Sequence, residues 1–458
     1  MNREPGGYDP NTSNQPLQPA SRVAAPSALF WFWMASGSTV AAAPAGVIVA
    51  TTPGVSAIGA LIAVLLGSLL AGLVLAAVSM AGVRTGSATL VLSDGVFGRR
   101  GNRVPLTVSF LVLMGWCAVM SVLLVYCVDA ILRKFGVMIN DAIRLLVLAV
   151  FALALVSLVW IGYRFIQATQ KWISLSVGIA ALAIGIATAL HTDWQRALAE
   201  PWKGAIPFLG AVVIAMTGAA SGWWNSGADF SRFQRPGTSR ASIVRAVLGG
   251  MNGYALMVLI GCVVAYWNPG VLTADNPVAA ATVAVPAWLT VAALLVITVG
   301  LHAGAVTNMY SASLNLNTFG VRNRAVSVAI SASLIILIAC WVLFWSDSFF
   351  NWFSSFLTAL GVPVAAWAGV FIVPVLASGD WPRTPPGAAW WPLAWLVTAS
   401  IVGLGLISSS TPGFTWVGYL APGSQLAAAG IGVIIAFVVA FGGAWLTRRR
   451  WLTTAQPD

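Results

Sequence analysis

The sequence predicts an all-α polytopic membrane protein with twelve transmembrane helices. Of its 458 residues, 59% are hydrophobic and only 8% are charged, whereas soluble domains carry roughly 25% charged residues. Twelve helices of about 20 residues each need about 240 residues, which a chain this apolar can supply. A soluble enzyme or a nucleic-acid-binding domain with this composition would expose too much apolar surface, so both classes are excluded.

Apolar runs bounded by proline, glycine and charged residues mark the twelve spans. Main-chain groups in hydrocarbon must find partners within their own segment, so we expect each span to be a helix. The expected spans are 28–52, 56–82, 104–132, 142–163, 172–192, 205–228, 241–267, 285–314, 325–346, 348–377, 389–409 and 424–447. We expect residues 1–27 to form a disordered cytoplasmic tail and residues 448–458 to form a second cytoplasmic tail.

The basic residues that give the chain its net charge of +11 are unevenly distributed between the two sides of the predicted membrane. With the amino terminus inside, 18 of the 23 basic residues fall on the cytoplasmic side, which leaves Arg133, Lys134, Arg144, Arg196 and Lys203 outside. This asymmetry is the positive-inside pattern of a multi-pass protein. It explains the charge without a nucleic-acid partner, and it predicts a plasma-membrane protein with both termini in the cytoplasm.

Two of the expected spans are interrupted by small and polar residues. The first contains Met34–Thr39 followed by Pro44, and the sixth contains Met216–Gly222. Glycine-interrupted segments at corresponding positions of two halves indicate the binding site of an inverted-repeat transporter. The alternative is that these small residues only allow close helix packing.

Four sequence blocks occur in a fixed order along the chain. The first runs from Arg84 through Asn102 to Pro105, and the others are Gly115-Trp116, Ala228–Phe233 and Thr307–Ala312. Together they resemble the nucleobase:cation symporter-1 family of cytosine, purine, uracil, allantoin and hydantoin permeases. The first block, which is the most specific, is similar to the family's cytoplasmic loop signature, and the other three resemble further family motifs in the family's order.

The resemblance implies a leucine-transporter-type fold and a cation-coupled symporter. The fold has two inverted repeats of five helices, here 28–192 and 205–377, and two peripheral helices within 389–447. The implied substrate is a nucleobase or related heterocycle, most simply of the cytosine or purine type, and an amino-acid or amine permease of the same fold is the alternative. No enzyme motif occurs in the sequence and no cofactor is expected besides a co-transported H+ or Na+. The partners expected are the substrate, the cation and the lipid bilayer. The sequence does not determine the oligomeric state, and a monomer is the simplest expectation.

A planar heterocycle needs an aromatic face for stacking and a few polar groups along its edge. By the resemblance, Trp116 supplies the face and Asn308 the polar edge. An interfacial anchor is the alternative for Trp116, and an interhelical hydrogen bond is the alternative for Asn308. Met120 stands where some relatives carry a glutamine, and Ala220 stands where the family has an aromatic residue. The other candidates, in the interrupted helices, are Gly37, Ser221, Gly222 and Trp223.

The coupling cation is expected at the interruption of the first span. The main chain from Ala35 through Ser36 to Ser38 supplies carbonyl ligands. In sodium-coupled relatives, hydroxyls precede the matching asparagine by five and six residues, and here these positions are Ala303 and His302. Imidazole is a poor sodium ligand. We therefore favour protons as the coupling cation, with His302 as the titrating group, and sodium is the second candidate. A neutral structural histidine is the alternative.

Two further groups are candidates for gates. Asp229 and Arg232 lie three residues apart at the end of the sixth span, and with Arg84, Arg99 and Arg100 they suggest an inner gate of ion pairs. A plain solvated helix end is the alternative. Phe349 and Phe356, in the aromatic start of the tenth span, are candidates for an outer lid, and ordinary interface aromatics are the alternative.

Overall fold

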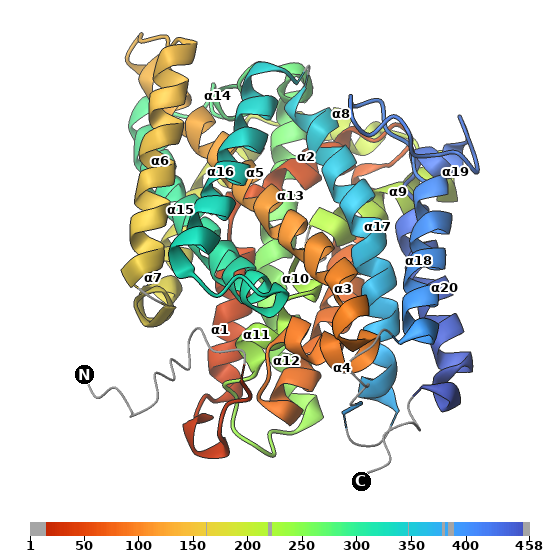
Figure 1. The fold of residues 1–458 in the computed structure, drawn as a ribbon. Helices are drawn as coiled ribbons and strands as arrows, with labels where there is room; N and C mark the ends of the chain where they lie inside the picture. The colour runs from red at the N-terminus through yellow and green to blue at the C-terminus, as the bar shows by residue number, and fades with distance from the viewer. Residues whose placement is uncertain are drawn as a thin grey trace.

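The protein is built from helices that run along one common direction (Figure 1). The computed structural model describes residues 15–161, 163–218, 222–346, 348–377, 381–382 and 389–451. The helices are α1 (Pro26–Gly37), α2 (Ala43–Thr51), α3 (Ala57–Thr85), α4 (Thr89–Gly101), α5 (Arg103–Lys134), α6 (Asp141–Ile161), α7 (Tyr163–Leu190), α8 (Trp194–Ala199), α9 (Ala205–Met216), α10 (Gly222–Trp224), α11 (Gly227–Ser231), α12 (Arg240–Gly250), α13 (Asn252–Trp267), α14 (Pro277–Ala281), α15 (Ala287–Phe319), α16 (Arg324–Phe344), α17 (Phe349–Leu376), α18 (Trp390–Gly405), α19 (Gln425–Ala428) and α20 (Gly432–Leu446). Short 3-10 turns occur at Pro19–Ser21, Val40–Ala42, Pro269–Thr273 and Arg448–Arg450.

The helices confirm the predicted class of an all-α polytopic membrane protein. Within the described residues, eight helical segments are long and apolar enough to cross a membrane, or nine if the bent pair α1 and α2 forms one span. The shorter apolar helices α9, α18 and α20 lie inside the expected spans 205–228, 389–409 and 424–447. The number of twelve spans stays a prediction.

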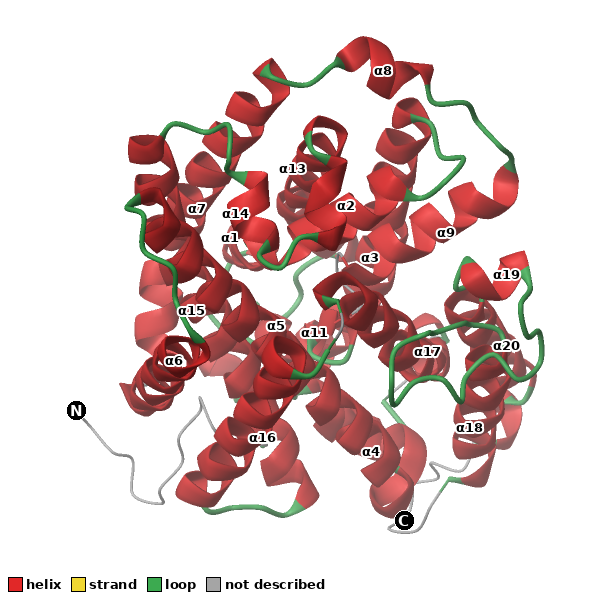
Figure 2. Ribbon diagram, turned by 90° about the horizontal axis from the view of Figure 1, so that it is seen from above, coloured by secondary structure: helices red, strands yellow, loops and turns green. Residues whose placement is uncertain are grey.

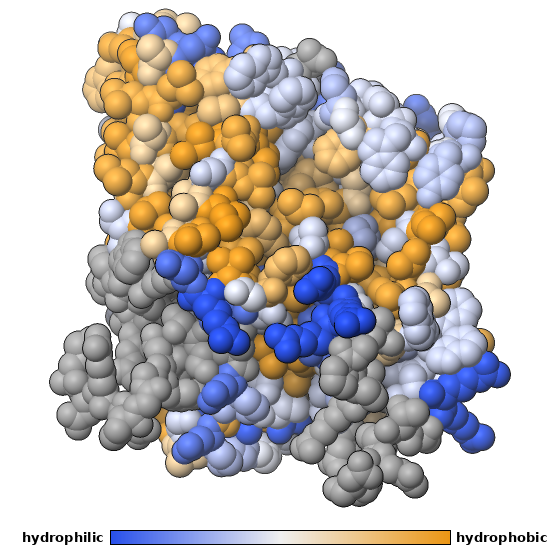
Figure 3. Space-filling model, viewed as in Figure 1, coloured by the Kyte–Doolittle hydropathy of each residue, from blue (hydrophilic) through white to orange (hydrophobic). Residues whose placement is uncertain are grey.

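An apolar band crosses the face of the molecule that Figure 3 shows, and we call it the apolar belt. Large aliphatic side chains of the protein are exposed, among them Leu153 (70%), Leu337 (67%) and Ile401 (54%). In water such a surface would be strongly unfavourable, whereas in a bilayer it contacts lipid tails.

The centre of the bundle is formed by helices from both expected halves. α5 packs along α15, and α2 packs along α13. α17 packs against α18 and α20, which lie at the edge of the molecule when it is viewed from above (Figure 2).

The segment before α1 corrects part of the expected disordered tail at 1–27. Residues 1–14 lie outside the described part of the chain, but residues 15–25 are folded against the bundle. The Leu17 N–H donates to the Gly86 carbonyl at 2.9 Å, and the Ala24 N–H donates to the Phe233 carbonyl at 3.0 Å. These hydrogen bonds, together with the burial of Leu17, fix a segment whose composition is typical of disorder. We call residues 17–24 the amino-terminal strap.

Two glycines allow α2 and α13 to approach until their main chains touch. A Cβ atom on Gly46 would lie 1.8 Å from the Val258 carbonyl oxygen, and one on Gly261 would lie 2.0 Å from the Ala43 carbonyl oxygen. Such distances are far inside van der Waals contact, so glycine is required at both positions. Small residues at helix contacts are a common means of close packing in membrane proteins.

We expect the substitution Gly46→Ala to destabilise the protein, because the added methyl group forces α2 away from α13. Overpacking of this kind costs about 1–3 kcal/mol. The melting temperature of the purified protein in detergent measures the effect. Gly442→Ala in α20 is the matched control, since a Cβ atom there meets nothing within 4 Å. Equal melting temperatures for the two variants would show that α2 and α13 are not in main-chain contact.

Candidate functional site

In both spans that the sequence predicts to be interrupted, the first α-helix ends within the predicted interruption. α1 and α2 are bent by 58°, and Thr39 caps the short turn between them by accepting a hydrogen bond from the Ala41 N–H at 3.4 Å. In the sixth span, α9 ends at Met216, a wider π turn covers Thr217 and Gly218, and α10 begins at Gly222. The candidates Ala220 and Ser221 lie outside the described residues.

A small cavity lies between the two breaks, and we call it the central cavity. It has about 20 Å³ of water-accessible space, and a water molecule needs roughly 10–15 Å³, so it is closed to anything larger. Its lining includes five of the predicted substrate residues. It is lined by Ser36, Thr39, Ala42, Trp116, Met120, Gly218, Gly222, Trp223, Tyr254 and Asn308.

Trp116 is held edge-on by two aromatic rings of α17. Its ring centre lies 5.9 Å from that of Phe353 and 5.7 Å from that of Phe356, both in T-shaped arrangements. The Trp116 indole also contacts Gly222 at the start of α10, where a Cβ atom would lie 2.1 Å from the indole Nε1. Trp116 is therefore a wall of the central cavity and not an anchor at the membrane surface.

The helix that contains Asn308 brings a polar group to the cavity. Asn308 is buried, and its Nδ2 donates to the Gly304 carbonyl one turn earlier at 3.0 Å. An amide nitrogen has a second hydrogen, and the amide oxygen is an acceptor, so the side chain retains capacity for a ligand. Gly37 does not line the cavity. A Cβ atom on Gly37 would lie 2.6 Å from the Tyr254 ring, so this glycine makes room for Tyr254.

A second small cavity adjoins the first, and we call it the side cavity. It also has about 20 Å³ of water-accessible space, which is room for about one water-sized particle. It brings together Ala35, Ser36, Ser38 and Ala303, which the sequence analysis grouped as cation residues. The complete lining is Ala35, Ser36, Ser38, Thr39, Met120, Ile173, Ser174, Val177, Trp223, Gly300, Ala303, Gly304 and Thr307.

Sequence reasoning missed three hydroxyl residues of the side cavity, Thr39, Ser174 and Thr307. Thr307 lies one turn after Ala303 and donates its hydroxyl hydrogen to the Ala303 carbonyl at 3.0 Å, which leaves its oxygen lone pairs available. The i, i+4 spacing from Ala303 could have identified it. Ser174 lies on α7, and no sequence signal connects it to this place. Ser36 Oγ is buried in the same lining and has no hydrogen-bond partner among the described residues.

His302 lines neither cavity, which corrects its expected grouping with Ala303. Its imidazole packs edge-on against Phe151 of α6, with ring centres 4.8 Å apart. Neighbouring residues on a helix point about 100° apart, so His302 faces α6 when Ala303 faces the side cavity.

Asp229 and Arg232 make separate contacts. The Asp229 carboxylate accepts a hydrogen bond from the Thr89 N–H of α4 at 2.8 Å. The Arg232 guanidinium is fully buried and donates to the Tyr310 hydroxyl of α15 at 3.1 Å. The two residues thus connect α11 to different helices. Arg99 and Arg100 are exposed at the far end of α4.

Phe356, in the aromatic start of α17, packs against Trp116, which lines the central cavity. A Cβ atom on Gly115 would lie 2.2 Å from the Phe356 ring, so the Gly-Trp pair provides the space for this contact. Phe349 lies farther out and stacks on Phe353 at 5.8 Å.

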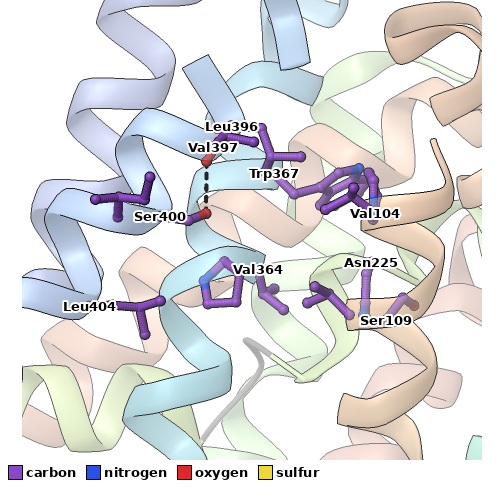
Figure 4. A pocket seen from close by; sticks show the side chains of 13 residues that line it. Val104, Ser109, Asn225, Val364, Trp367, Leu396, Val397, Ser400 and Leu404 are labelled. Carbon is purple, nitrogen blue, oxygen red and sulfur yellow. Dashed lines mark hydrogen bonds between the residues drawn. The ribbon is translucent and has the colours of Figure 1, made fainter. Parts of the chain in front are cut away.

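A larger cavity of about 170 Å³ lies beside α5, α17 and α18 (Figure 4). Its lining is almost entirely apolar, with side chains such as Val364, Trp367 and Leu396. Asn225 is a buried polar residue there, and neither of its amide atoms has a hydrogen-bond partner in the part of the chain that the structure describes. Ser400 uses its hydroxyl hydrogen on the Leu396 carbonyl at 2.7 Å. This lining offers few groups for the edge of a heterocycle, so the smaller central cavity is the better candidate site.

Solved structures share the fold over nearly the whole chain. Mhp1, a nucleobase-cation-symport-1 family transporter, in a closed conformation with bromovinylhydantoin bound, has a TM-score of 0.71 at 21% identity, covering 97% of this chain and 96% of that one. A Na+-coupled sialic acid symporter in a substrate-bound outward-open state has a TM-score of 0.64 at 13% identity, with coverages of 94% and 91%. The Eremococcus coleocola manganese transporter has a TM-score of 0.57 at 14% identity, with coverages of 92% and 95%.

No curated protein matches the chain in sequence. The sequence profile of the permeases for cytosine/purines, uracil, thiamine and allantoin matches residues 16–379. This match covers most of the chain, including all the blocks on which the predicted resemblance rests. It also identifies a transporter and not an enzyme. The chain belongs to this permease family.

Proposed function

We propose that this permease imports a nucleobase or related heterocycle across the plasma membrane by alternating access, coupled to a cation gradient. The observation that carries the proposal is the central cavity, where two broken helices meet an aromatic wall at Trp116 and an amide at Asn308. The asymmetry of the basic residues supports an orientation with both termini in the cytoplasm.

The chemistry of the central cavity favours a flat neutral ring. Trp116 provides a stacking face, and Gly222 allows the main chain of the sixth span to lie close to it. The Asn308 amide can donate and accept hydrogen bonds along the edge of the ring. None of the residues that line the cavity is ionised. An amino-acid or amine substrate would leave its charge without a counter-charge, which is costly in a buried site.

The closed cavity implies that the substrate enters and leaves through other conformations. Ligand pockets usually measure about 300–1,000 Å³, far more than the central cavity. Since Phe356 lies against Trp116, movement of the start of α17 is the simplest way to open the cavity on the outer side. We therefore propose Phe356, supported by Phe349 through Phe353, as the outer lid. Asp229 and Arg232 are proposed to steady the inner end of the sixth span.

The side cavity favours Na+ as the coupling cation. Its polar lining offers oxygen atoms from the hydroxyls of Ser36, Thr39, Ser174 and Thr307 and from the main chain of the α1 break. Hard cations prefer oxygen ligands, and unwound main chain in transporters of this kind coordinates the coupling ion. Ser36, Thr39, Met120 and Trp223 line both cavities, so an ion in one stabilises the walls of the other. Proton coupling through His302 is the alternative.

We expect heterocycles and not amino acids to stabilise the purified protein. A ligand present at about 100 times its Kd stabilises the folded state by about 2.7 kcal/mol. Melting temperatures with cytosine, uracil, adenine, allantoin and hydantoin test this, and Asn308→Ala should abolish the shift. Stabilisation by leucine or choline, with no effect of any heterocycle, would favour the alternative permease.

We expect Gly222→Ala to reduce substrate uptake by about tenfold or more, which corresponds to about 1.4 kcal/mol. The added methyl group overlaps the Trp116 indole and displaces it from the cavity wall. Initial uptake rates in proteoliposomes measure the effect. Gly178→Ala in α7 is the matched control, because a Cβ atom there meets nothing within 4 Å. Equal uptake by both variants would exclude Trp116 from the binding site.

We expect an inward Na+ gradient at constant pH to drive uptake. Ser36→Ala should raise the half-saturating Na+ concentration by about tenfold, because it removes a ligand oxygen, while His302→Gln should leave the Na+ dependence unchanged. Uptake by proteoliposomes with imposed Na+ or pH gradients separates the two mechanisms. Uptake driven by a pH gradient alone, and lost in His302→Gln, would instead establish proton coupling.

A further inference from the structure

A hollow of about 300 Å³ lies where α4 and α5 meet the end of α15. Three exposed arginines line it, Arg99, Arg100 and Arg103, and we call them the arginine cradle. Leu106, Thr318 and Phe319 complete the lining. Strongly hydrophilic surface lies just below the apolar belt on this side of the molecule (Figure 3).

The cradle has an excess of positive charge. None of its arginines takes part in an ion pair within the described part of the chain. The nearby carboxylate of Asp94 accepts a hydrogen bond from Asn102 at 2.6 Å. Burial raises the pKa of Asp94, although this hydrogen bond and the charge of Arg99 act in the opposite direction. One partly buried carboxylate does not balance three guanidinium groups, so the cradle has a positive potential that attracts anions.

The guanidinium groups determine which anion fits. Arginine presents a planar fork of donors that matches the oxygens of a phosphate, often through two parallel hydrogen bonds. Three such groups around one hollow suit a phosphate better than a small halide, which cannot use the forks.

The surface next to the cradle suits the tails of a lipid. Phe319, which belongs to the lining of the cradle at the end of α15, is 46% exposed. On α16, which packs against α5, Val326 and Ile330 are 46% and 40% exposed. An anion with acyl chains would use both surfaces, whereas free phosphate would use only the arginines.

We propose that the arginine cradle binds the phosphate headgroup of an anionic phospholipid. The bound lipid holds the corner between α4 and α5 against the end of α15. Since the other end of α4 binds Asp229 through Thr89, the lipid also steadies the inner end of the sixth span. Lipid binding itself does not depend on the substrate or the cation of the permease.

The test uses the full-length protein in nanodiscs of phosphatidylcholine with a minor fraction of phosphatidylglycerol. Native mass spectrometry measures how much phosphatidylglycerol remains bound. We expect the triple variant R99Q/R100Q/R103Q to retain about tenfold less than the unmodified protein. The variant R99K/R100K/R103K, which keeps the charge but loses the forks, should lie in between.

The matched control is R448Q/R449Q/R450Q, which removes the same charge elsewhere. Arg448 and Arg450 cover the rings of Trp445 and Trp391, at 4.4 and 4.8 Å from the ring centres, so this variant should retain the lipid. Melting temperatures check that the variants fold. Equal losses in the two glutamine variants would show unspecific attraction and overturn the proposal, as would unchanged retention in R99Q/R100Q/R103Q. Displacement of the lipid by millimolar inorganic phosphate would assign the cradle to a soluble anion instead.

Discussion

Main-chain polar groups inside a bilayer must find partners within the protein, and this constraint determines where the permease can have a binding site. A broken helix leaves peptide groups unpaired, so it is tolerated only where protein or a polar cavity surrounds it. The break between α1 and α2 and the break after α9 both lie in the interior and border the same central cavity. The unpaired groups that make the breaks costly in lipid are the groups that make them useful for polar ligands.

Close contact between helices positions this site. Glycines allow main chains or aromatic rings to lie where a methyl group would not fit, as at Gly46 against α13 and at Gly222 against Trp116. The Trp116 ring thereby contacts both a broken helix and the start of α17. A change in the angle of any of these elements alters the cavity wall, and this gives a physical basis for alternating access.

The sequence was sufficient to predict the fold class, the places where α1 and α9 end and five of the residues that line the central cavity. Trp116, Gly222 and Asn308 could be predicted because they lie in or beside motifs and interruptions that are visible along the chain. The facing direction of His302 could not be predicted, because it depends on how α15 is rotated against α6. Ser174 could not be predicted either, since it reaches the side cavity only through the packing of α7. The order in residues 17–24 was missed because it arises from hydrogen bonds to distant segments and not from local propensity.

The amino-terminal strap has a consequence for how the inner half of α1 can move. Its hydrogen bonds attach the start of α1 to the end of α3 on one side and to the segment after α11 on the other. A main-chain hydrogen bond contributes about 0.5–1.5 kcal/mol, so tilting α1 outward on its own is penalised by several such bonds at once. The strap therefore ties the inner end of the first span to those of the second and sixth spans, so a movement of one must carry the other two or break these bonds.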